Sequence, residues 1–120
     1  MTNNKAAYDL YLQGRALTNR MFGNGMLSKA IEFLEQALAL DPNFAECWTA
    51  LAEAYVHRVV YTPCYDRQAQ SETMAECARR AIALDPAQGH AHAMLGLYKW
   101  IQNDAVGALD LAYEAYRLEP

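Results

Sequence analysis

Residues 81–86, Ala-Ile-Ala-Leu-Asp-Pro, have two counterparts in this chain of 120 residues: Ala-Leu-Ala-Leu-Asp-Pro at 37–42 and Ala-Tyr-Arg-Leu-Glu-Pro at 115–120. The prolines that close these hexads are 44 and 34 residues apart, within the range of periods found in stacked repeat proteins. Units of this kind bury their apolar faces against one another and leave an extended surface. The recurrence therefore predicts a stack of like units, and a surface that binds.

The hexads also predict where helices end. Proline disfavours helical geometry in the residue before it and cannot donate to a helix already running, so helices should end near Leu40, Leu84 and Leu118. Strand-forming runs are scarce, with Arg58–Thr62 the nearest candidate. Small or apolar residues at fixed offsets before each proline share one helical face, and they are Ala30, Leu34 and Ala37; Met74, Ala78 and Ala81; and Ala108, Ala112 and Ala115.

Each unit is predicted to contain two helices. The second helices should span about 28–40, 67–84 and 105–118, and the first helices about 4–20, 44–60 and 89–102. The first helix of the middle unit carries an apolar stripe of Trp48, Leu51, Ala52 and Tyr55. A glycine inside a helix costs about 1 kcal/mol relative to alanine, so Gly14 and Gly96 predict a close approach between helices.

Taken together, this pattern resembles the tetratricopeptide repeat, W-x2-L-[GA]-x2-Y followed by A-x3-[small or apolar]-x2-A and proline. The middle unit supplies the stripe just given, and the third supplies Leu95, Gly96, Ala108, Ala112, Ala115 and Pro120. The match covers nearly the whole chain. It departs from the motif at Leu10 and His92, where the family favours an aromatic residue, and at Lys99, where it favours tyrosine.

The resemblance implies one all-α domain over residues 1–120. It is an α-solenoid of three helix-turn-helix repeats, with six antiparallel helices wound as a right-handed superhelix. The repeats should cover about 4–42, 43–86 and 87–120.

The units differ in length between their two helices. From the small residue of the first helix (14, 52 or 96) to the closing proline they measure 28, 34 and 24 residues. We expect the extra residues in loops at Met21–Met26 and around Tyr61–Ser71. Gly23-Asn24-Gly25 is a turn signal, and Thr62-Pro63 before Asp66 predicts a break and a helix cap. Such longer repeats resemble those beside catalytic or DNA-binding domains of bacterial cyclases and transcriptional regulators.

In the family that the chain resembles, the first helices line a concave surface. The faces of the first helices that do not carry the apolar stripe predict a groove for a peptide or helix of a partner protein. The alternative is that these residues are ordinary solvated positions. The groove would have an aromatic and cationic end, an acidic middle and an apolar far end. The predicted contact residues are Tyr8, Tyr11, Arg15, Asn19, Glu46, Thr49, Glu53, His57, His90, Leu97 and Trp100.

One sub-class of the family grips a terminal carboxylate with lysines, arginines and asparagines. Here the residues near those positions are Tyr11, Ala50, His90 and Met94. Only Arg15 and Asn19 are left as polar contacts, so we predict that this clamp is absent, and with it the binding of chaperone tails.

The last hexad coincides with the last residue of the sequence. Solenoids generally need a polar terminal cap, yet the outer face of 105–118 includes Leu109, Leu111, Tyr113 and Tyr116, with Trp100 and Ile101 nearby. We expect this uncapped helix to pair with a second copy as a homodimer, or with a further domain of the same protein. The alternative function is then a regulatory or dimerisation segment of a larger bacterial signalling enzyme or transcriptional regulator.

Composition excludes several classes of protein. The net charge of −4 argues against a nucleic-acid partner, and no apolar run is long enough for a membrane span. Residues 1–12 lack the apolar core of a signal peptide. The cysteines, Cys47, Cys64 and Cys77, are odd in number and have no paired spacing, which indicates reduced thiols in a cytoplasmic protein.

The chain is not predicted to be an enzyme, and no catalytic, metal or cofactor site is expected. His90 and His92 point apart on a helix, and Cys64 has no base partner. Glu46 and Glu53 lie two turns apart, about 10 Å, where an acidic face for a basic partner explains them as well as a carboxylate pair does.

Overall fold

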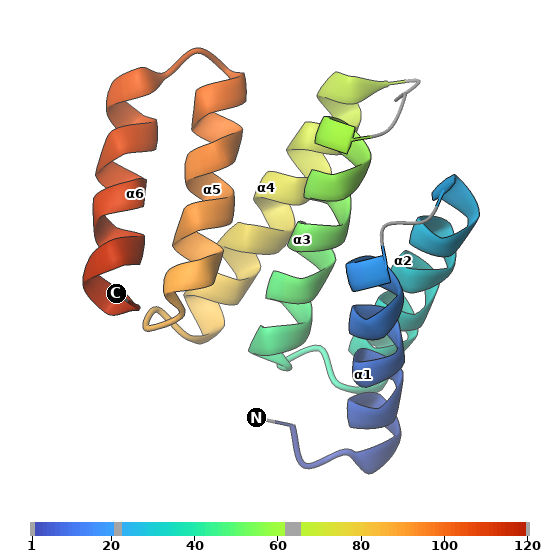
Figure 1. Cartoon of the computed structure of the whole chain (residues 1–120). Coiled ribbons are helices and arrows are strands. Elements are labelled where there is room, and N and C mark those ends of the chain that lie inside the picture. Colours follow the sequence, from blue (N-terminus) through green and yellow to red (C-terminus); the bar gives the residue numbers. More distant parts are fainter. Residues whose placement is uncertain (1, 21–22, 62–65, 120) are drawn as a thin grey trace.

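The computed structural model describes residues 2–20, 23–61 and 66–119, and in these residues it contains six helices and no strand (Figure 1). The helices are α1 (Lys5–Arg20), α2 (Gly23–Leu40), α3 (Ala45–Tyr61), α4 (Arg67–Leu84), α5 (Gly89–Ile101) and α6 (Ala105–Leu118). Consecutive helices pack as antiparallel hairpins, α1 with α2, α3 with α4 and α5 with α6. The prediction of an all-α stack of three helix-turn-helix units is confirmed.

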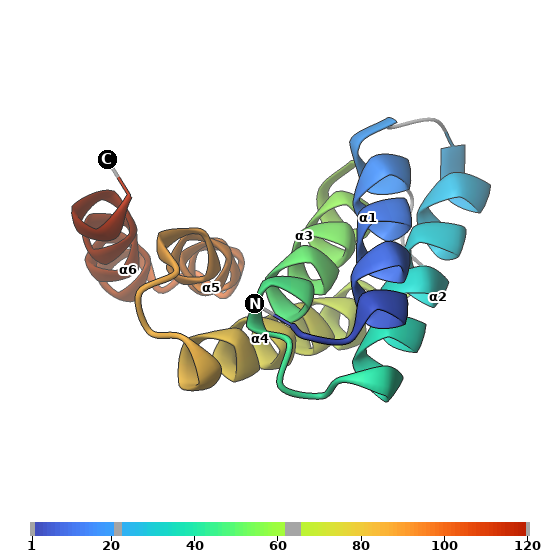
Figure 2. The same ribbon diagram turned by 90° about the horizontal axis from the view of Figure 1, so that it is seen from below.

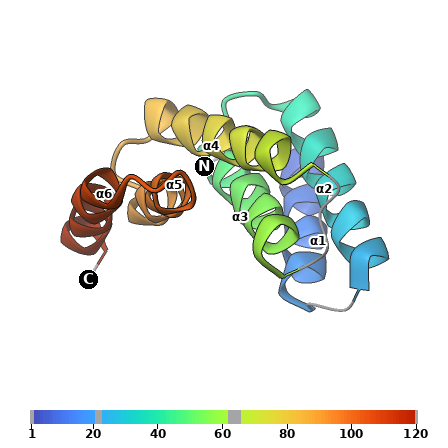
Figure 3. The ribbon, with the colours of Figure 1, turned by 90° about the horizontal axis from the view of Figure 1, so that it is seen from above.

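The first helices form the inner layer of a curved stack. α3 contacts both α1 and α5, whereas over the described residues α4 contacts neither α2 nor α6. The second helices therefore spread apart on the outside of the curve, as the views from below and from above show (Figures 2 and 3). No helix in the described parts of the chain is long and apolar enough to cross a membrane.

A repeated set of hydrogen bonds explains the hexads. The acidic residue before each proline donates its backbone N–H to the carbonyl of the alanine four residues earlier. The N–O distances are 3.0, 2.8 and 3.0 Å for Asp41, Asp85 and Glu119. At Asp41 and Asp85 the carboxylate also accepts the N–H of the residue two positions later, at 3.1 Å in both turns. The same residue thus ends one helix and turns the chain toward the next.

His92 preserves a contact of the tryptophan that it replaces. Trp48 Nε1 donates to the carbonyl of Pro42 at 2.8 Å, and His92 Nε2 lies 3.0 Å from the carbonyl of Pro86. Because a carbonyl can only accept, His92 carries a proton on Nε2. The departure from the motif at position 92 therefore keeps the hydrogen bond that fastens the first helix to the preceding turn.

The core lies mainly in the first two units. Phe44, Leu34, Met74 and Val59 are its largest fully buried apolar side chains. The predicted small and apolar faces of α2 and α4 are buried throughout, whereas α6 has no buried residue because it packs against α5 alone. Of the predicted stripe on α3, Leu51 and Ala52 are buried, and Trp48 and Tyr55 are half-buried against the core.

The extra residues lengthen helices, which corrects the expectation that both insertions are loops. Gly23, Asn24 and Gly25, predicted as a turn, lie in α2, which has 18 residues where α6 has 14. In the middle unit α3 and α4 have 17 and 18 residues, against 13 and 14 in α5 and α6. Four residues are about one helical turn, so each added segment preserves the buried face of its helix.

The break before α4 is described only in part. Thr62 and Pro63 lie outside the described residues. Asp66 caps α4 as predicted, because its Oδ1 accepts the N–H of Ala69 at 3.0 Å.

Gly14 and Gly96 both face the second helix of their unit, but at different distances. A β-carbon at Gly14 would lie 2.6 Å from Cγ of Leu34, which is completely buried. At Gly96 the nearest atom would be Cβ of Leu111, at 3.3 Å, on the outer helix α6. The first unit therefore requires glycine more strictly than the third.

We predict that Gly14→Ala lowers the free energy of unfolding by about 1–2 kcal/mol, because the overpacking cost outweighs the gain in helix propensity. Gly96→Ala should change it by less than about 1 kcal/mol, since α6 has room to shift and the propensity gain offsets the contact. Urea unfolding followed by far-UV circular dichroism measures both. Equal losses in the two variants would contradict the difference in packing.

Candidate functional site

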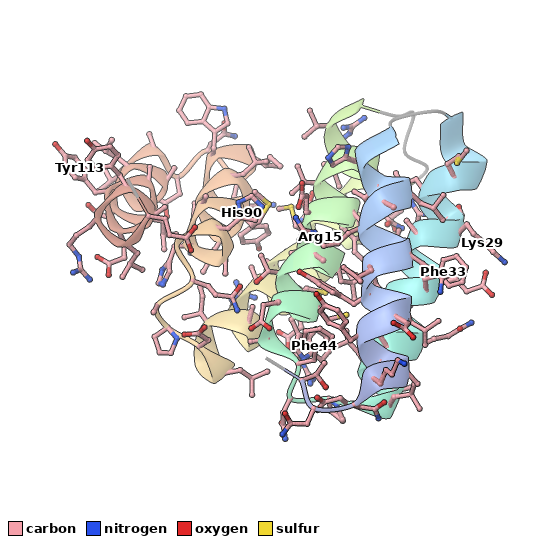
Figure 4. The ribbon with its side chains drawn as sticks, turned by 60° about the horizontal axis from the view of Figure 1, so that its bottom comes forward. Arg15, Lys29, Phe33, Phe44, His90 and Tyr113 are labelled. Carbon is pink, nitrogen blue, oxygen red and sulfur yellow. The ribbon has the colours of Figure 1, made fainter. Side chains whose placement is uncertain are left out.

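The concave side of the stack is hollowed by an open pocket of about 310 Å³. All three first helices contribute to it, together with the turn before α5 and the residue after α6. Its lining residues are Tyr11, Arg15, Glu46, Thr49, Ala50, Glu53, Gln88, His90 and Glu119. Arg15 of α1 and His90 of α5 enter this space from different helices, on either side of α3 (Figure 4).

The structure brings together six of the eleven predicted contact residues, which are Tyr11, Arg15, Glu46, Thr49, Glu53 and His90. The other described members lie outside the pocket. Tyr8, His57 and Leu97 are half-buried, and Trp100 is 64% exposed. The side chain of Asn19 lies outside the described residues.

Tyr11 is mainly a packing residue. Only 7% of it is exposed, and its ring centroid lies 4.8 Å from that of Phe44. Its hydroxyl accepts from Arg15 Nη1 at 3.1 Å, and the guanidinium carbon of Arg15 lies 5.6 Å from the ring centroid. Burial raises the pKa of Tyr11, and the adjacent Arg15 opposes that shift. Tyr11 therefore supports Arg15 at the edge of the pocket and offers little surface of its own.

The equivalent junction between the second and third units is polar. Thr49 occupies the position in α3 that Tyr11 has in α1, and Gln88 follows Pro86 as Phe44 follows Pro42. Thr49 Oγ1 lies 2.5 Å from Gln88 Oε1, so a hydrogen bond takes the place of the aromatic contact. The amide nitrogen of Gln88 is buried and has no acceptor among the described residues. Sequence reasoning missed Gln88, which counting from the prolines would have identified.

His90 and Glu53 form an ion pair across the pocket. Nε2 of His90 lies 3.4 Å from Oε2 of Glu53. The hydrogen bond from His90 lowers the pKa of Glu53, and the same bond raises the pKa of His90. Burial opposes both shifts. The pair joins α3 of the second unit to α5 of the third.

Glu119, which sequence reasoning also missed, links the end of α6 to the start of α5. Its Oε1 accepts the backbone N–H of Gly89 at 2.9 Å. A carboxylate at a helix N-terminus is favoured by the helix dipole. The pocket thus contains the carboxylates of Glu46, Glu53 and Glu119, against the cation of Arg15 and the titratable His90.

A second hollow, of about 470 Å³, lies on the outer side between α2, α3 and α4. It includes Trp48, and the guanidinium of Arg80 lies 5.0 Å from the centroid of that ring. Arg80 Nε also pairs with Glu76 Oε1 at 3.1 Å. The aromatic face in this hollow is therefore already covered by a side chain of the protein.

The described cysteines are poorly suited to nucleophilic chemistry. Burial raises the pKa of Cys47 and of Cys77 to about 12, so both thiols are protonated at neutral pH. Both are free of disulfides, whereas Cys64 lies outside the described residues. In the parts of the chain that the structure describes, no group of three or more potential ligands could hold a metal ion.

Comparison with known proteins agrees with the geometry. Residues 21–58 match the family model of the tetratricopeptide repeat. The Sgt2 tetratricopeptide domain from Aspergillus fumigatus superimposes with a TM-score of 0.76 at 27% identity, over 97% of this chain and 68% of that one. The chain therefore contains a match to the tetratricopeptide repeat and has the fold of tetratricopeptide-repeat domains. A search of curated protein sequences finds no match.

Two further solved structures share the fold of these tetratricopeptide repeats. A thermophilic tetratricopeptide-repeat protein of Thermus thermophilus gives a TM-score of 0.81 at 20% identity, over 98% of this chain and 59% of that one. The second tetratricopeptide domain of Spaghetti (RPAP3) gives 0.76 at 20% identity, over 96% and 94%. That domain was solved bound to the HSP90 peptide SRMEEVD.

We predict that His90→Gln destabilises the protein most between pH 4.5 and 6.5. The raised pKa of His90 gives stability that is complete below 6.5 and lost as the pH rises through the folded pKa. The lowered pKa of Glu53 gives stability that is complete above 4.5 and lost as the pH falls through the folded pKa. Because 48% of the His90 side chain and 29% of the Glu53 side chain are exposed, the loss should be only about 0.3–1 kcal/mol.

Urea unfolding at pH 5.5 and 8.5 measures this effect. Lys29→Gln is the control, because the Lys29–Glu32 pair contains no histidine. A loss in His90→Gln that is equal at the two pH values would contradict the ion-pair assignment.

Proposed function

We propose that the chain is a protein-interaction module that holds a peptide or helix of a partner protein in the groove formed by α1, α3 and α5. The observation that carries the proposal is the pocket on the concave side, to which all three first helices contribute polar or charged side chains. The peptide-bound Spaghetti domain, which has the same fold, supports this use of the repeats.

We propose that rigidly packed helices hold the contact side chains in place before the partner binds. α1 and α3 are fixed by buried residues of α2 and α4, such as Leu34 and Met74, which have no exposed surface. Groups that are already ordered lose little conformational entropy when a ligand binds. The module needs neither a cofactor nor a catalytic step for this function, and we place it in the cytoplasm, where protonated free thiols such as Cys47 and Cys77 persist.

The peptide should differ from the one bound by Spaghetti. Ala50 is buried, and Met94 packs half-buried against the core, so neither supplies a polar group for a terminal carboxylate. Arg15 remains, but it is bonded to Tyr11. This arrangement supports the prediction that a carboxylate clamp for chaperone tails is absent.

Peptides selected by this protein from a random 12-residue library displayed on phage should bind the concave face. In ¹H–¹⁵N correlation spectra of the labelled protein, we expect the largest peptide-induced shifts at amides of α1, α3 and α5. Shifts concentrated in α2, α4 and α6 would place the binding surface on the outside and contradict the proposed groove.

A specific observation favours self-association as a second candidate function. Val106, Leu109, Tyr113 and Tyr116 are 60–74% exposed and follow one another at spacings of three, four and three residues. This spacing forms a narrow stripe of the kind that pairs helices in coiled coils. Leu111, predicted on the same outer face, instead lies half-buried toward Gly96 of α5. A second copy could cover the stripe with its own, because a two-fold interface is self-complementary.

If α6 mediates self-association, the chain should form a dimer at micromolar concentration. Tyr113→Glu should then convert it to a monomer by placing a charge in the apolar contact. Multi-angle light scattering gives the mass of each species. Asp110→Asn on the same helix is the control, since it alters charge beside the stripe and leaves the apolar residues intact. A wild-type monomer throughout this range would exclude pairing through α6.

A further inference from the structure

The pocket on the concave side carries an excess of negative charge. Glu46 and Glu53 of α3 and Glu119 after α6 face it, whereas Arg15 is its only permanent cation among the described residues. His90 adds a second positive charge only when protonated. Carboxylates from separate parts of the chain thus converge on one space that is open to solvent.

Two of these carboxylates are held in place and keep the capacity to accept further hydrogen bonds. Oε2 of Glu53 pairs with His90, and Oε1 of Glu119 accepts the N–H of Gly89. A carboxylate has about four acceptor sites, so one such bond leaves the group able to bind a donor of a ligand. Both are therefore fixed acceptors before a ligand arrives.

Arg15, the cation that opposes these carboxylates, lies at the edge of the pocket. The guanidinium of Arg15 donates to the Tyr11 hydroxyl and lies over the face of the same ring. These contacts hold Arg15 against α1, and Glu53 takes His90 as its ion-pair partner. Arg15 still acts on Glu53, because its positive charge contributes to the lowered pKa of that carboxyl, so a ligand cation that enters the pocket meets Glu53 with His90 beside it and Arg15 at the edge.

Resting on the proposed groove function, we infer that this pocket binds a lysine or arginine side chain of the partner peptide. The cationic head would lie among Glu46, Glu53 and Glu119, and a volume of about 310 Å³ holds one long side chain. Gln88, whose amide nitrogen has no acceptor among the described residues, lines the same space. The ligand class is thus a basic peptide, the opposite in charge of the acidic SRMEEVD bound by the Spaghetti domain.

Peptides selected from the 12-residue phage library supply the probe. The selected sequences should share a lysine or arginine, and replacing it with norleucine should weaken binding about tenfold, as measured by fluorescence anisotropy of the labelled peptide. Synthetic SRMEEVD should not displace the labelled peptide. Selected sequences without a common basic residue, or displacement by SRMEEVD, would overturn the inference.

Two variants of the protein should change the affinity for the basic peptide in opposite directions. Glu53→Gln removes an attractive charge and should weaken binding about five- to tenfold, whereas Arg15→Gln removes a like charge and should strengthen it about two- to fivefold. Glu35→Gln, which lies in the outer hollow, is the matched control and should have no effect. Circular dichroism verifies that each variant is folded.

The outcomes separate this inference from the groove proposal. If Glu53→Gln strengthens binding and Arg15→Gln weakens it, the pocket binds an anionic group and the inference is wrong. If neither variant changes the affinity while the amide shifts still map to α1, α3 and α5, the groove stands and the basic-residue pocket is overturned. If the shifts map to the outer helices, both proposals fail.

Discussion

The hydrogen bond from the acid before each proline to the alanine four residues earlier is the constraint on which the structure depends. It closes the second helix of every unit at the same distance from its buried face. Where the acid is aspartate, its carboxylate then accepts the next free amide and directs the chain into the following first helix. The inner position of α1, α3 and α5, and hence the concave surface, follows from these identical ends. Variation in helix length is confined to the opposite end of each hairpin, where about one helical turn is added.

The two junctions between units are filled by different kinds of side chain. Tyr11 and Phe44 fill the first junction with aromatic rings, whereas Thr49 and Gln88 fill the second with a hydrogen bond. The apolar junction excludes water and is continuous with the main core. The polar junction leaves room for the charged groups of Glu53, His90 and Glu119, which is why the pocket forms there. The polar pair that stands in place of the aromatic pair thus reduces the apolar core and creates the candidate site.

Sequence periodicity predicted the helices well because proline and the buried alanine faces act locally. It failed for Gly23–Gly25, where the turn signal lies inside the first turn of α2. Six of the eleven predicted groove residues share one pocket, because helical spacing determines which side of a first helix is left over. Periodicity could not show that Tyr11 and Thr49 are buried, since their cover comes from the turn of the next unit. Nor could it find Glu119, whose partner Gly89 is 30 residues away.

The exposure of α6 affects which part of the molecule unfolds first. A helix with no buried residue, joined to the stack through α5 and a polar junction, contributes least to the cooperative core. In a linear array of repeats such a unit unfolds at lower free energy than its neighbours, and its amides exchange with solvent first. A ligand that bridges Glu53 and Glu119 would connect this end unit to the middle one. Binding would then be linked to folding of the last repeat, and occupancy could be read from hydrogen-exchange protection far from the contact itself.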